Sequence, residues 1–499
     1  MGIVARQTIK NNILAYVGIG FGVLSQLYIY PLDLELKGVL DTVIKYAQML
    51  LPFTLLGVNA VMIRFLPYSE NPAEEAKIQL LTRGLTVVIA VLLAITLFNL
   101  LAAEPLFFLL KEQGFLLDKV YNYHWEITWL AGAFGMAVVI TTHLINMRRV
   151  AIPVIFNNWF LKVGLALIVL AVASDYVVPE YALPAVIAVS WLAVAGLFLY
   201  TFRLGALGLK WGNLNLKGVP VKEMFSLAGF SILGSAGGTI AVQLDTLMVN
   251  YYLGDKTTAI YTFVVFAALV ISIPYKAINS ICSPLVAEAL KADDIKTIQL
   301  LYQQASQVLF AIGGVVFTGT AVCLPFVYEL TSRTDQYAIG FVATLLLGVG
   351  QLFDQLTSIN AVILGASKYF RWNIIFLLVM ALANVVLNYY FFAVLGWGLE
   401  GAASATMLSL ILFNVLKALF IYSKLGVHPL SLSLLYTFCA LFIIGVLAYL
   451  LPTDSLNPYL SVGFKGAFIV GSFGLYVRFT EGVPPMKKVL DGGLKKLFE

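Results

Sequence analysis

Residues 182–202 read ALPAVIAVSWLAVAGLFLYTF and contain no charged residue over 21 consecutive positions. A helix of this length rises about 30 Å at about 1.5 Å per residue, which matches the hydrocarbon thickness of a bilayer. An apolar stretch longer than about 18 residues is typical of a transmembrane helix. The segment therefore predicts one membrane-spanning helix.

The rest of the chain has a similar composition. Of its 499 residues, 61% are apolar and 11% are charged, and the mean hydropathy is +0.92. An ordinary soluble domain carries roughly 25% charged residues. The composition therefore excludes both a soluble fold and a single anchor with a water-soluble domain. It predicts an all-α, polytopic integral membrane protein.

Apolar runs of about 20 residues, separated by charges, proline or glycine, mark the candidate spans. We identify fourteen: 11–32, 38–63, 78–101, 124–146, 151–173, 182–202, 226–252, 258–282, 302–325, 337–364, 372–394, 401–422, 431–451 and 459–479.

The longest gap among the first twelve spans is a basic stretch that separates six helices from six. We therefore predict an N-terminal six-helix lobe over 1–202 and a basic cytoplasmic linker over 203–225. A C-terminal six-helix lobe follows over 226–424. Two extra helices and a basic cytoplasmic tail occupy 425–499.

Basic residues are distributed unequally between the two faces of this topology. With the N-terminus inside, the outer loops contain five basic residues: Lys37, Lys111, Lys119, Lys256 and Arg333. The inner face, including both termini, contains 22, and the remaining four of the 31 lie within helices. Because cytoplasmic loops are enriched in Lys and Arg, both termini are expected in the cytoplasm.

No loop of this topology is long enough to form a domain, so any function has to reside between the helices. The sequence contains no Walker-type phosphate loop, no HExxH motif and no Cys/His cluster. We therefore expect a transporter without its own ATPase rather than an enzyme, with no cofactor, no metal site and no nucleic-acid partner.

Lys162 is the most informative polar residue within a span. It lies about eleven residues into 151–173, near the membrane midplane and too deep to snorkel. Asn158 is one turn earlier on the same face, whereas Ala166 and Val169 are apolar. Because charges are costly in lipid, the pattern predicts a polar cavity that reaches from the cytoplasmic side to mid-membrane. The alternative is a lysine neutralised by a buried carboxylate.

A polar stripe follows one side of the span 337–364. Its side chains recur at i, i+3, i+4 and i+7: Gln351, Asp354, Gln355 and Ser358. Such a stripe faces either an aqueous path or a polar partner helix, and we expect it in the interior of the second lobe. Asp354 is also a candidate coupling residue.

The span 226–252 has a polar side that includes Gln243 and a small-residue seam that includes Asp245. Small residues let another helix approach closely, which favours Asp245 as an interhelical tie over an ion or proton site.

Two lysines complete the candidate set. Lys45 follows Asp41 by four residues and can pair with it near the outer mouth. Lys276 follows Pro274 and either lines the inner vestibule or snorkels. The candidate substrate cavity then contains Lys162, Asn158, Lys276, Lys45, Gln351, Asp354, Gln355 and Gln243.

Several segments resemble a known family. Two of them resemble the two halves of the polysaccharide-export family. They are residues 36–67, LKGVLDTVIKYAQMLLPFTLLGVNAVMIRFLP, and residues 384–406, NVVLNYYFFAVLGWGLEGAASAT. Residues 243–249 and 251–254 are similar to the start of that family's second lobe. The family comprises the O-antigen (Wzx-type) lipid-linked oligosaccharide flippases of the multidrug/oligosaccharidyl-lipid/polysaccharide (MOP) superfamily.

The resemblance implies a MATE-like fold of two pseudo-symmetric six-helix lobes around a central cavity, with alternating access. It also implies a location in the cytoplasmic (inner) membrane of a bacterium. It implies flipping of an undecaprenyl-diphosphate-linked glycan from the inner to the outer leaflet, for lipopolysaccharide O-antigen or other surface polysaccharide biosynthesis. The implied partners are this lipid-linked glycan, the bilayer, H⁺ or Na⁺ as coupling ion, and the polysaccharide polymerisation machinery. A cationic cavity suits a diphosphate, and Lys162 supplies one charge at the right depth.

Three other functions remain open. A multidrug (MATE-type) cation antiporter would need mid-membrane carboxylates in the first lobe, where Asp41 and Glu126 lie near the outer face. A peptidoglycan lipid II flippase is expected to have several arginines in its first-lobe cavity, whereas these spans offer lysines. A membrane glycan polymerase or ligase usually needs a sizeable outer loop, which this topology lacks.

The distribution of basic residues gives the first testable prediction. After alanine replacement of the three native cysteines, the variants Lys111→Cys and Lys256→Cys should react with a membrane-impermeant maleimide added to intact cells. Glu499→Cys should react only after permeabilisation, because the C-terminus is expected in the cytoplasm. Labelling of position 499 from outside would contradict this topology.

Overall fold

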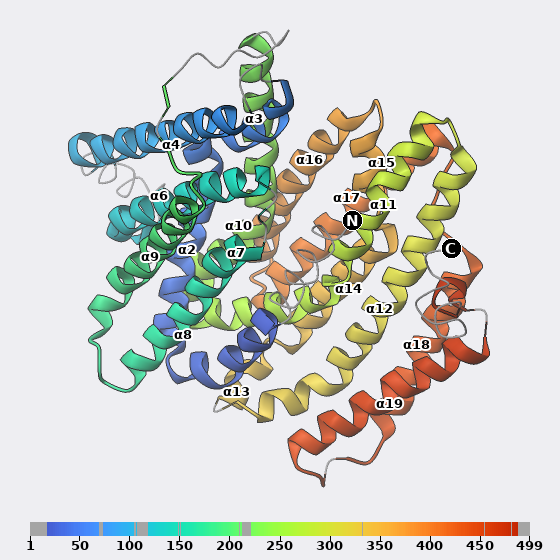
Figure 1. Cartoon of the computed structure of the whole chain (residues 1–499). Coiled ribbons are helices and arrows are strands. Elements are labelled where there is room, and N and C mark those ends of the chain that lie inside the picture. Colours follow the sequence, from blue (N-terminus) through green and yellow to red (C-terminus); the bar gives the residue numbers. More distant parts are fainter. Residues whose placement is uncertain are drawn as a thin grey trace. The chain divides into compact units, whose positions relative to one another are not determined.

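The computed structural model describes residues 17–68, 73–103, 106, 118–147, 149, 151–208, 210–211, 221–331, 333–453, 455–480 and 482–487. These residues form helices joined by turns, and no strand occurs among them. A helix satisfies its backbone hydrogen bonds within itself, as a chain at membrane depth requires. The chain divides into two compact units, Met1–Ala259 and Ile260–Glu499, which are described separately (Figure 1).

Unit 1 contains long and short α-helices. They are α2 (Leu34–Leu55), α3 (Val58–Arg64), α4 (Ala73–Phe98), α6 (Asp118–Asn146), α7 (Ala151–Val154), α8 (Phe160–Ala173), α9 (Ala182–Arg203) and the first part of α10 (Val221–Leu269). Buried side chains of α2, α6, α8 and α9 form one apolar cluster, and those of α2, α3, α4, α6 and α9 form a second. The helix α6 contributes to both clusters and is therefore central to this unit.

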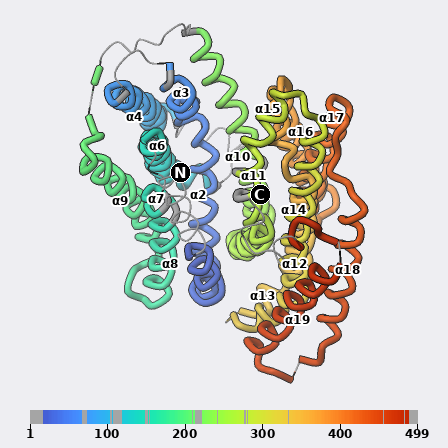
Figure 2. Tube along the Cα trace, turned by 45° about the vertical axis from the view of Figure 1, so that its right-hand side comes forward, coloured from blue at the N-terminus to red at the C-terminus, as the bar shows by residue number. Residues whose placement is uncertain are grey.

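Unit 2 contains the end of α10 and the remaining α-helices. They are α11 (Tyr275–Lys291), α12 (Ile295–Glu329), α13 (Thr334–Ala338), α14 (Phe341–Thr357), α15 (Asn360–Ala366), α16 (Phe370–Tyr389), α17 (Leu399–Leu425), α18 (Leu432–Leu450) and α19 (Pro458–Phe479). The helix α14 packs against α12 and α17, and α18 and α19 form a hairpin on α12 (Figure 2).

Ten helices of the described residues are long and apolar enough to cross a membrane, or twelve if each of two bent helix pairs is one span. The protein is therefore an all-helical, multi-pass membrane protein. Of the predicted span 11–32, the part from Val17 to Leu32 forms a shorter apolar helix. The helix α10 runs through the predicted gap between 252 and 258 but breaks there, at Gly254 (φ 82°). A total of fourteen spans remains a prediction, as do the predicted lobe limits at 202 and 226.

Two spans are broken in mid-course. The pair α2–α3 bends by 53° at Leu56 and Gly57, which both have left-handed φ values, and α14–α15 bends by 45° at Ser358. A break within a membrane span leaves backbone carbonyls without helical partners, so neighbouring groups have to satisfy them.

In unit 1, α2 and the first part of α10 run antiparallel in close contact. A Cβ atom at Gly57 would lie 2.5 Å from the Ala228 carbonyl oxygen, and one at Gly38 would lie 1.8 Å from the Asp255 carbonyl oxygen. Only glycine permits this approach, because both obstructing atoms belong to the backbone.

Lys465 of α19 joins the two helices of the C-terminal hairpin. Its side chain is 2% exposed and its Nζ donates to the carbonyl oxygens of Ala448, Tyr449 and Leu451 at 3.0, 3.2 and 3.1 Å. A cation is favourable at the C-terminal end of a helix, so this lysine stabilises the end of α18.

The contact at Gly38 predicts that Gly38→Ala destabilises the protein by about 2 kcal/mol or more, because the methyl group would overlap the α10 backbone. Thermal unfolding in detergent should show a lower Tm. The control is Gly229→Ala in α10, where a Cβ atom meets nothing within 4 Å. Equal melting temperatures for the two variants would contradict the close approach.

Candidate functional site

A row of polar side chains follows one face of α2 in unit 1. Lys37, Asp41, Lys45 and Gln48 are spaced four, four and three residues apart, which places them on one side of the helix. Lys37 belongs to the first part of α2 and is 3% exposed, so its predicted place in an outer loop was wrong. The residues after Asp33, which caps the helix, are already helical.

Asp41 lies between two lysines. It forms an ion pair with Lys37, whose Nζ also lies 4.5 Å from the centre of the Tyr30 ring. It acts electrostatically on Lys45 as well, and Asp245 of α10 does the same. The side chains of Asp41 and Asp245 are 8% and 4% exposed. Two lysines and two carboxylates therefore form a compensated charge cluster, as burial in a membrane protein requires.

The structure brings together Lys45, Gln243 and Asp245 of the predicted set. Gln243 Nε2 donates to Gln48 Oε1 of α2 at 2.8 Å, next to the charge cluster. The position of Asp245 opposite the lysines of α2 agrees with an interhelical tie. Its role stays a prediction.

A second polar junction in unit 1 lies at Asp255, just after the break in α10. Lys119 of α6 forms an ion pair with its Oδ2 at 2.8 Å, and Asn250 Nδ2 donates to its Oδ1 at 2.8 Å. Gly38 of α2 touches the backbone of Asp255. Three helices therefore meet here, and sequence reasoning did not identify this junction because each polar residue lies near a helix end.

The Lys162 side chain is exposed, and it lies on the side of α8 that faces the core of unit 1. The next positions on its face, Ala166 and Val169, are buried in the core cluster, whereas Leu167 and Leu170 are exposed on the opposite side. The Lys162 side chain has no ion pair among the described residues, which disfavours the alternative of a lysine neutralised by a buried carboxylate. It is thus an exposed cation without a carboxylate partner among the described residues.

Two other members of the predicted cavity are not placed. The side chains of Asn158 and Lys276 lie outside the described part of the structure. The backbone of Asn158 belongs to a π-helical turn, Ile155–Trp159, directly before α8. The expected one-turn relation between Asn158 and Lys162 therefore stays a prediction.

In unit 2, Asp354 of α14 has partners on α17. Asn414 Nδ2 donates to Asp354 Oδ1 at 2.9 Å, and Lys417, one turn further along α17, acts on the same carboxylate. Lys417 is 3% exposed, and its Nζ lies 3.8 Å from the centre of the Phe413 ring. Asp354 therefore faces a polar partner helix rather than lipid.

Asn414 connects both sides of the break between α14 and α15. Its amide binds Asp354 before the break, and its carbonyl oxygen accepts from Asn360 Nδ2 after the break at 3.4 Å. Asn360 Oδ1 in turn accepts from the Tyr302 hydroxyl of α12. The bend of α14–α15 is thus held by polar contacts from two neighbouring helices.

The other members of the predicted stripe differ in environment. Gln351 is half-buried, whereas Gln355 and Ser358 are buried. Gln355 points toward α12 rather than α17. A Cβ atom added to Gly313 of α12 would lie 3.3 Å from Gln355 Cγ. Sequence reasoning missed Asn414 and Lys417, although two polar residues three apart in an apolar span are a readable signal.

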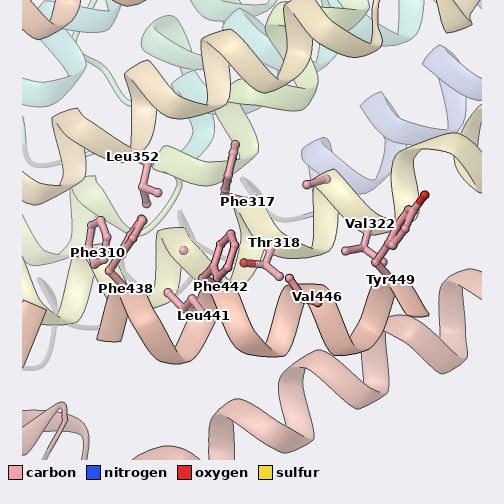
Figure 3. Close-up of a pocket in the computed structure, with 13 residues that line it drawn as sticks. Phe310, Phe317, Thr318, Val322, Leu352, Phe438, Leu441, Phe442, Val446 and Tyr449 are labelled. Atoms are coloured by element: carbon pink, nitrogen blue, oxygen red, sulfur yellow. The ribbon is translucent and has the colours of Figure 1, made fainter. Parts of the chain in front are cut away.

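An apolar cavity of about 300 Å³ lies between α12, α14 and α18 (Figure 3). Its walls include four aromatic rings, those of Phe310, Phe317, Phe438 and Phe442. Two lining residues, Thr318 and Tyr449, carry hydroxyl groups. Its composition suits a hydrocarbon chain rather than a polar ligand.

A larger apolar groove of about 520 Å³ lies in unit 1 on α2, α6 and α10. Its lining includes Tyr46, Phe53, Ile127, Met248 and Tyr251. Among the described residues, no group of three His, Cys, Asp or Glu side chains could hold a metal ion.

No protein-family model matches this sequence, and no curated protein is similar to it in sequence. The structure, however, is similar to that of lipid II flippase MurJ in an inward closed conformation. The TM-score is 0.70 at 14% identity, over 94% of this chain and 98% of the other. The chain has the fold of the MOP transporter superfamily.

Two further structures with the MOP fold are similar. An inward-facing multidrug resistance MATE family transporter has a TM-score of 0.61 at 13% identity, over 83% of this chain and 94% of its own. A MOP superfamily transporter from Pyrococcus furiosus has a TM-score of 0.53 at 13% identity, and the match covers 85% of this chain and 95% of that transporter. All three are transporters rather than enzymes. The predicted MOP fold is confirmed, and the narrower polysaccharide-export family remains a prediction.

The contact between α14 and α17 predicts a coupling between Asp354 and Lys417. Lys417→Met should lower the stability by about 3 kcal/mol, because it leaves a carboxylate without its cation. The double variant Asp354→Asn with Lys417→Met should recover most of this loss, since Asn414 can still bind the amide. Thermal unfolding of the three proteins measures the difference, and purely additive effects would disprove the coupling.

Proposed function

We propose that this MOP-fold protein is a transporter that flips a polyprenyl-diphosphate-linked oligosaccharide from the cytoplasmic to the outer leaflet. Surface polysaccharide biosynthesis is the proposed use of that substrate. The observation that carries the proposal is Lys162, an exposed cation on the inward side of α8 without a carboxylate partner among the described residues. A diphosphate that crosses a bilayer loses water, and a cation along its path offsets that loss.

The charges around the other mid-span lysines support the same substrate class. Lys45 lies beside Asp41 and Asp245, and Lys417 lies beside Asp354. These lysines are compensated, so they are less suited to attract an anion than Lys162 is. The same pairing disfavours an antiporter of organic cations, because the three carboxylates already face lysines.

The apolar cavity on α12 and α18 supports a lipid-linked substrate. It offers aromatic and aliphatic walls at the depth of membrane-spanning helices. A polyprenyl chain needs such a surface once its head group has left the leaflet, because hydrocarbon gains little from polar walls. A free sugar or a small organic cation would have no use for this cavity.

The second candidate is a peptidoglycan lipid II flippase. The similarity to MurJ favours it, since that structure is matched over 94% of this chain, against 83% for the MATE transporter. Both candidates move a polyprenyl-diphosphate-linked glycan and differ in the glycan. Complementation in strains that lack either flippase distinguishes them, because only the correct glycan restores surface polysaccharide or cell-wall growth.

Lys162 gives the test of the substrate class. Lys162→Ala should reduce flipping about 10-fold or more, the loss expected when a charged group in a desolvated path is left without its partner. Lys162→Arg should retain part of the activity because it keeps the charge. Flipping is measured in proteoliposomes as exposure of a polyprenyl-diphosphate-linked glycan to a membrane-impermeant probe, with membrane abundance and surface glycan in parallel.

The matched control is Lys424→Ala, which removes an exposed lysine from the last turn of α17. It should leave flipping unchanged. Wild-type activity of Lys162→Ala at normal abundance would overturn the role of Lys162 in substrate binding. A loss of abundance in step with activity would instead assign a structural role to this lysine.

A further inference from the structure

The chain turns sharply where α9 of unit 1 ends. Arg203 is the last residue of this helix, and Gly205 follows with a left-handed φ of 66°. The Gly205 N–H donates to the Phe202 carbonyl oxygen at 2.9 Å. The Ala206 N–H donates to the Thr201 carbonyl oxygen at 3.2 Å. These bonds and the left-handed glycine form a Schellman motif, so the chain after Gly205 no longer follows the axis of α9.

The residues after this turn are held on α4 and α6. His143 Nε2 of α6 donates to the Ala206 carbonyl oxygen at 3.2 Å. Thr82 Oγ1 of α4 accepts from the Lys210 N–H at 3.1 Å. Ala206 is 5% exposed, and Leu207 packs against the apolar cluster of α4, α6 and α9. One side of this segment is therefore fixed to the helices of unit 1.

The side chains that hold the segment mark a boundary of the membrane. Thr82 is separated only by Arg83 from the uncharged run 84–103, and His143 directly follows the uncharged run 127–142. A helical run of about 20 residues spans the hydrocarbon core of a bilayer, about 30 Å. The segment therefore lies where the hydrocarbon meets the head groups. The distribution of basic residues predicts that this end of the helices is cytoplasmic.

The other side of the segment is exposed and carries cations and an aromatic ring. Trp211 is 72% exposed, and Phe202, in the last turn of α9, is 66% exposed. Arg203 is exposed and forms no ion pair among the described residues. The Lys210 side chain is 52% exposed, and its Nζ lies 3.6 Å from Glu75 Oε1. An ion pair with this exposure is weak, so Lys210 remains able to contact another anion.

We propose that this boundary segment, residues 203–208 with Lys210 and Trp211, binds anionic phospholipids of the cytoplasmic leaflet. Tryptophan is enriched at membrane interfaces because its ring is apolar and its N–H is polar. Basic residues near the cytoplasmic leaflet attract anionic head groups. The Trp211 ring then lies among the head groups, and Arg203 and Lys210 contact the lipid phosphates.

This surface uses none of the residues of the proposed substrate site, and it does not require that the protein flips a glycan. A cytoplasmic protein is a less suitable partner, because the head groups already occupy the level at which the segment lies. The segment belongs to the connection between α9 and α10. Bound lipid therefore holds this connection at the membrane surface.

A fluorescent probe at position 211 tests where the segment lies. In full-length protein with its three cysteines replaced by alanine, Trp211→Cys is labelled with an environment-sensitive maleimide and reconstituted into liposomes. Phospholipid with a spin label at the top of its acyl chain should quench this probe strongly. The matched control is Glu74→Cys, an exposed position eight residues before Thr82 on α4 and thus about 12 Å further from the boundary. Equal quenching at the two positions would overturn the proposal.

The preference for anionic lipid is tested with two quenchers of the same kind. At equal mole fractions, spin-labelled phosphatidylglycerol should quench the probe at position 211 more than spin-labelled phosphatidylcholine does. High salt should remove the difference, because it screens exposed charges. Equal quenching by the two lipids at low salt would overturn the anionic preference.

Variants of the labelled protein test the two cations. Arg203→Gln and Lys210→Gln should each lower the preference for phosphatidylglycerol by up to about 5-fold, the contribution of one basic residue near an anionic surface. Arg203→Gln alone keeps the test valid if loss of the Lys210 contact to Glu75 destabilises the protein. The control Lys291→Gln removes an exposed lysine from the last turn of α11 in unit 2 and should leave the preference unchanged. A preference that survives both substitutions would overturn the role of Arg203 and Lys210.

Discussion

The rest of the structure depends on one constraint, the cost of placing polar groups at membrane depth. The chain meets it by pairing charges between neighbouring positions and between helices. Lys37 and Asp41 pair along α2, Asp354 is bound from α17, and Lys465 binds the end of α18. Each contact gives a buried charged group polar partners, and the contacts of Asp354 and Lys465 also join neighbouring helices.

The broken helices follow from the same constraint. Where α2–α3 and α14–α15 bend, glycine or polar side chains occur at or beside the break. Gly57 lets the bend of α2 contact the backbone of α10 directly. At the bend of α14, Asn414 and Asn360 join the two halves.

Lys162 differs from the other lysines in this respect. A charge exposed on the inward side of a helix, without a carboxylate among the described residues, contributes nothing to packing that an apolar residue could not provide. Under the proposed function, this lysine is the group that meets the anionic head group. The apolar cavity on α12 and α18 adds a surface for hydrocarbon, and both features suit a lipid with an anionic head group.

Hydropathy and periodicity were sufficient to predict a helical membrane protein and the approximate position of most of the long helices among the described residues. These properties are local, because about 20 apolar residues determine whether a segment enters a bilayer. The resemblance of short segments added the MOP fold, which the structural similarity confirms. The predicted interior position of Asp354 agrees with its contact to Asn414.

The partners of these residues were decided only by the tertiary structure. Asp354 and Asn414 are 60 residues apart, and Gln48 and Gln243 are 195 apart, so no local pattern connects them. The π turn Ile155–Trp159 directly before α8 also has no signal in the apolar pattern of the span. Whether a lysine is compensated or available to a ligand depends on which helix lies opposite, and that is a property of the folded chain alone.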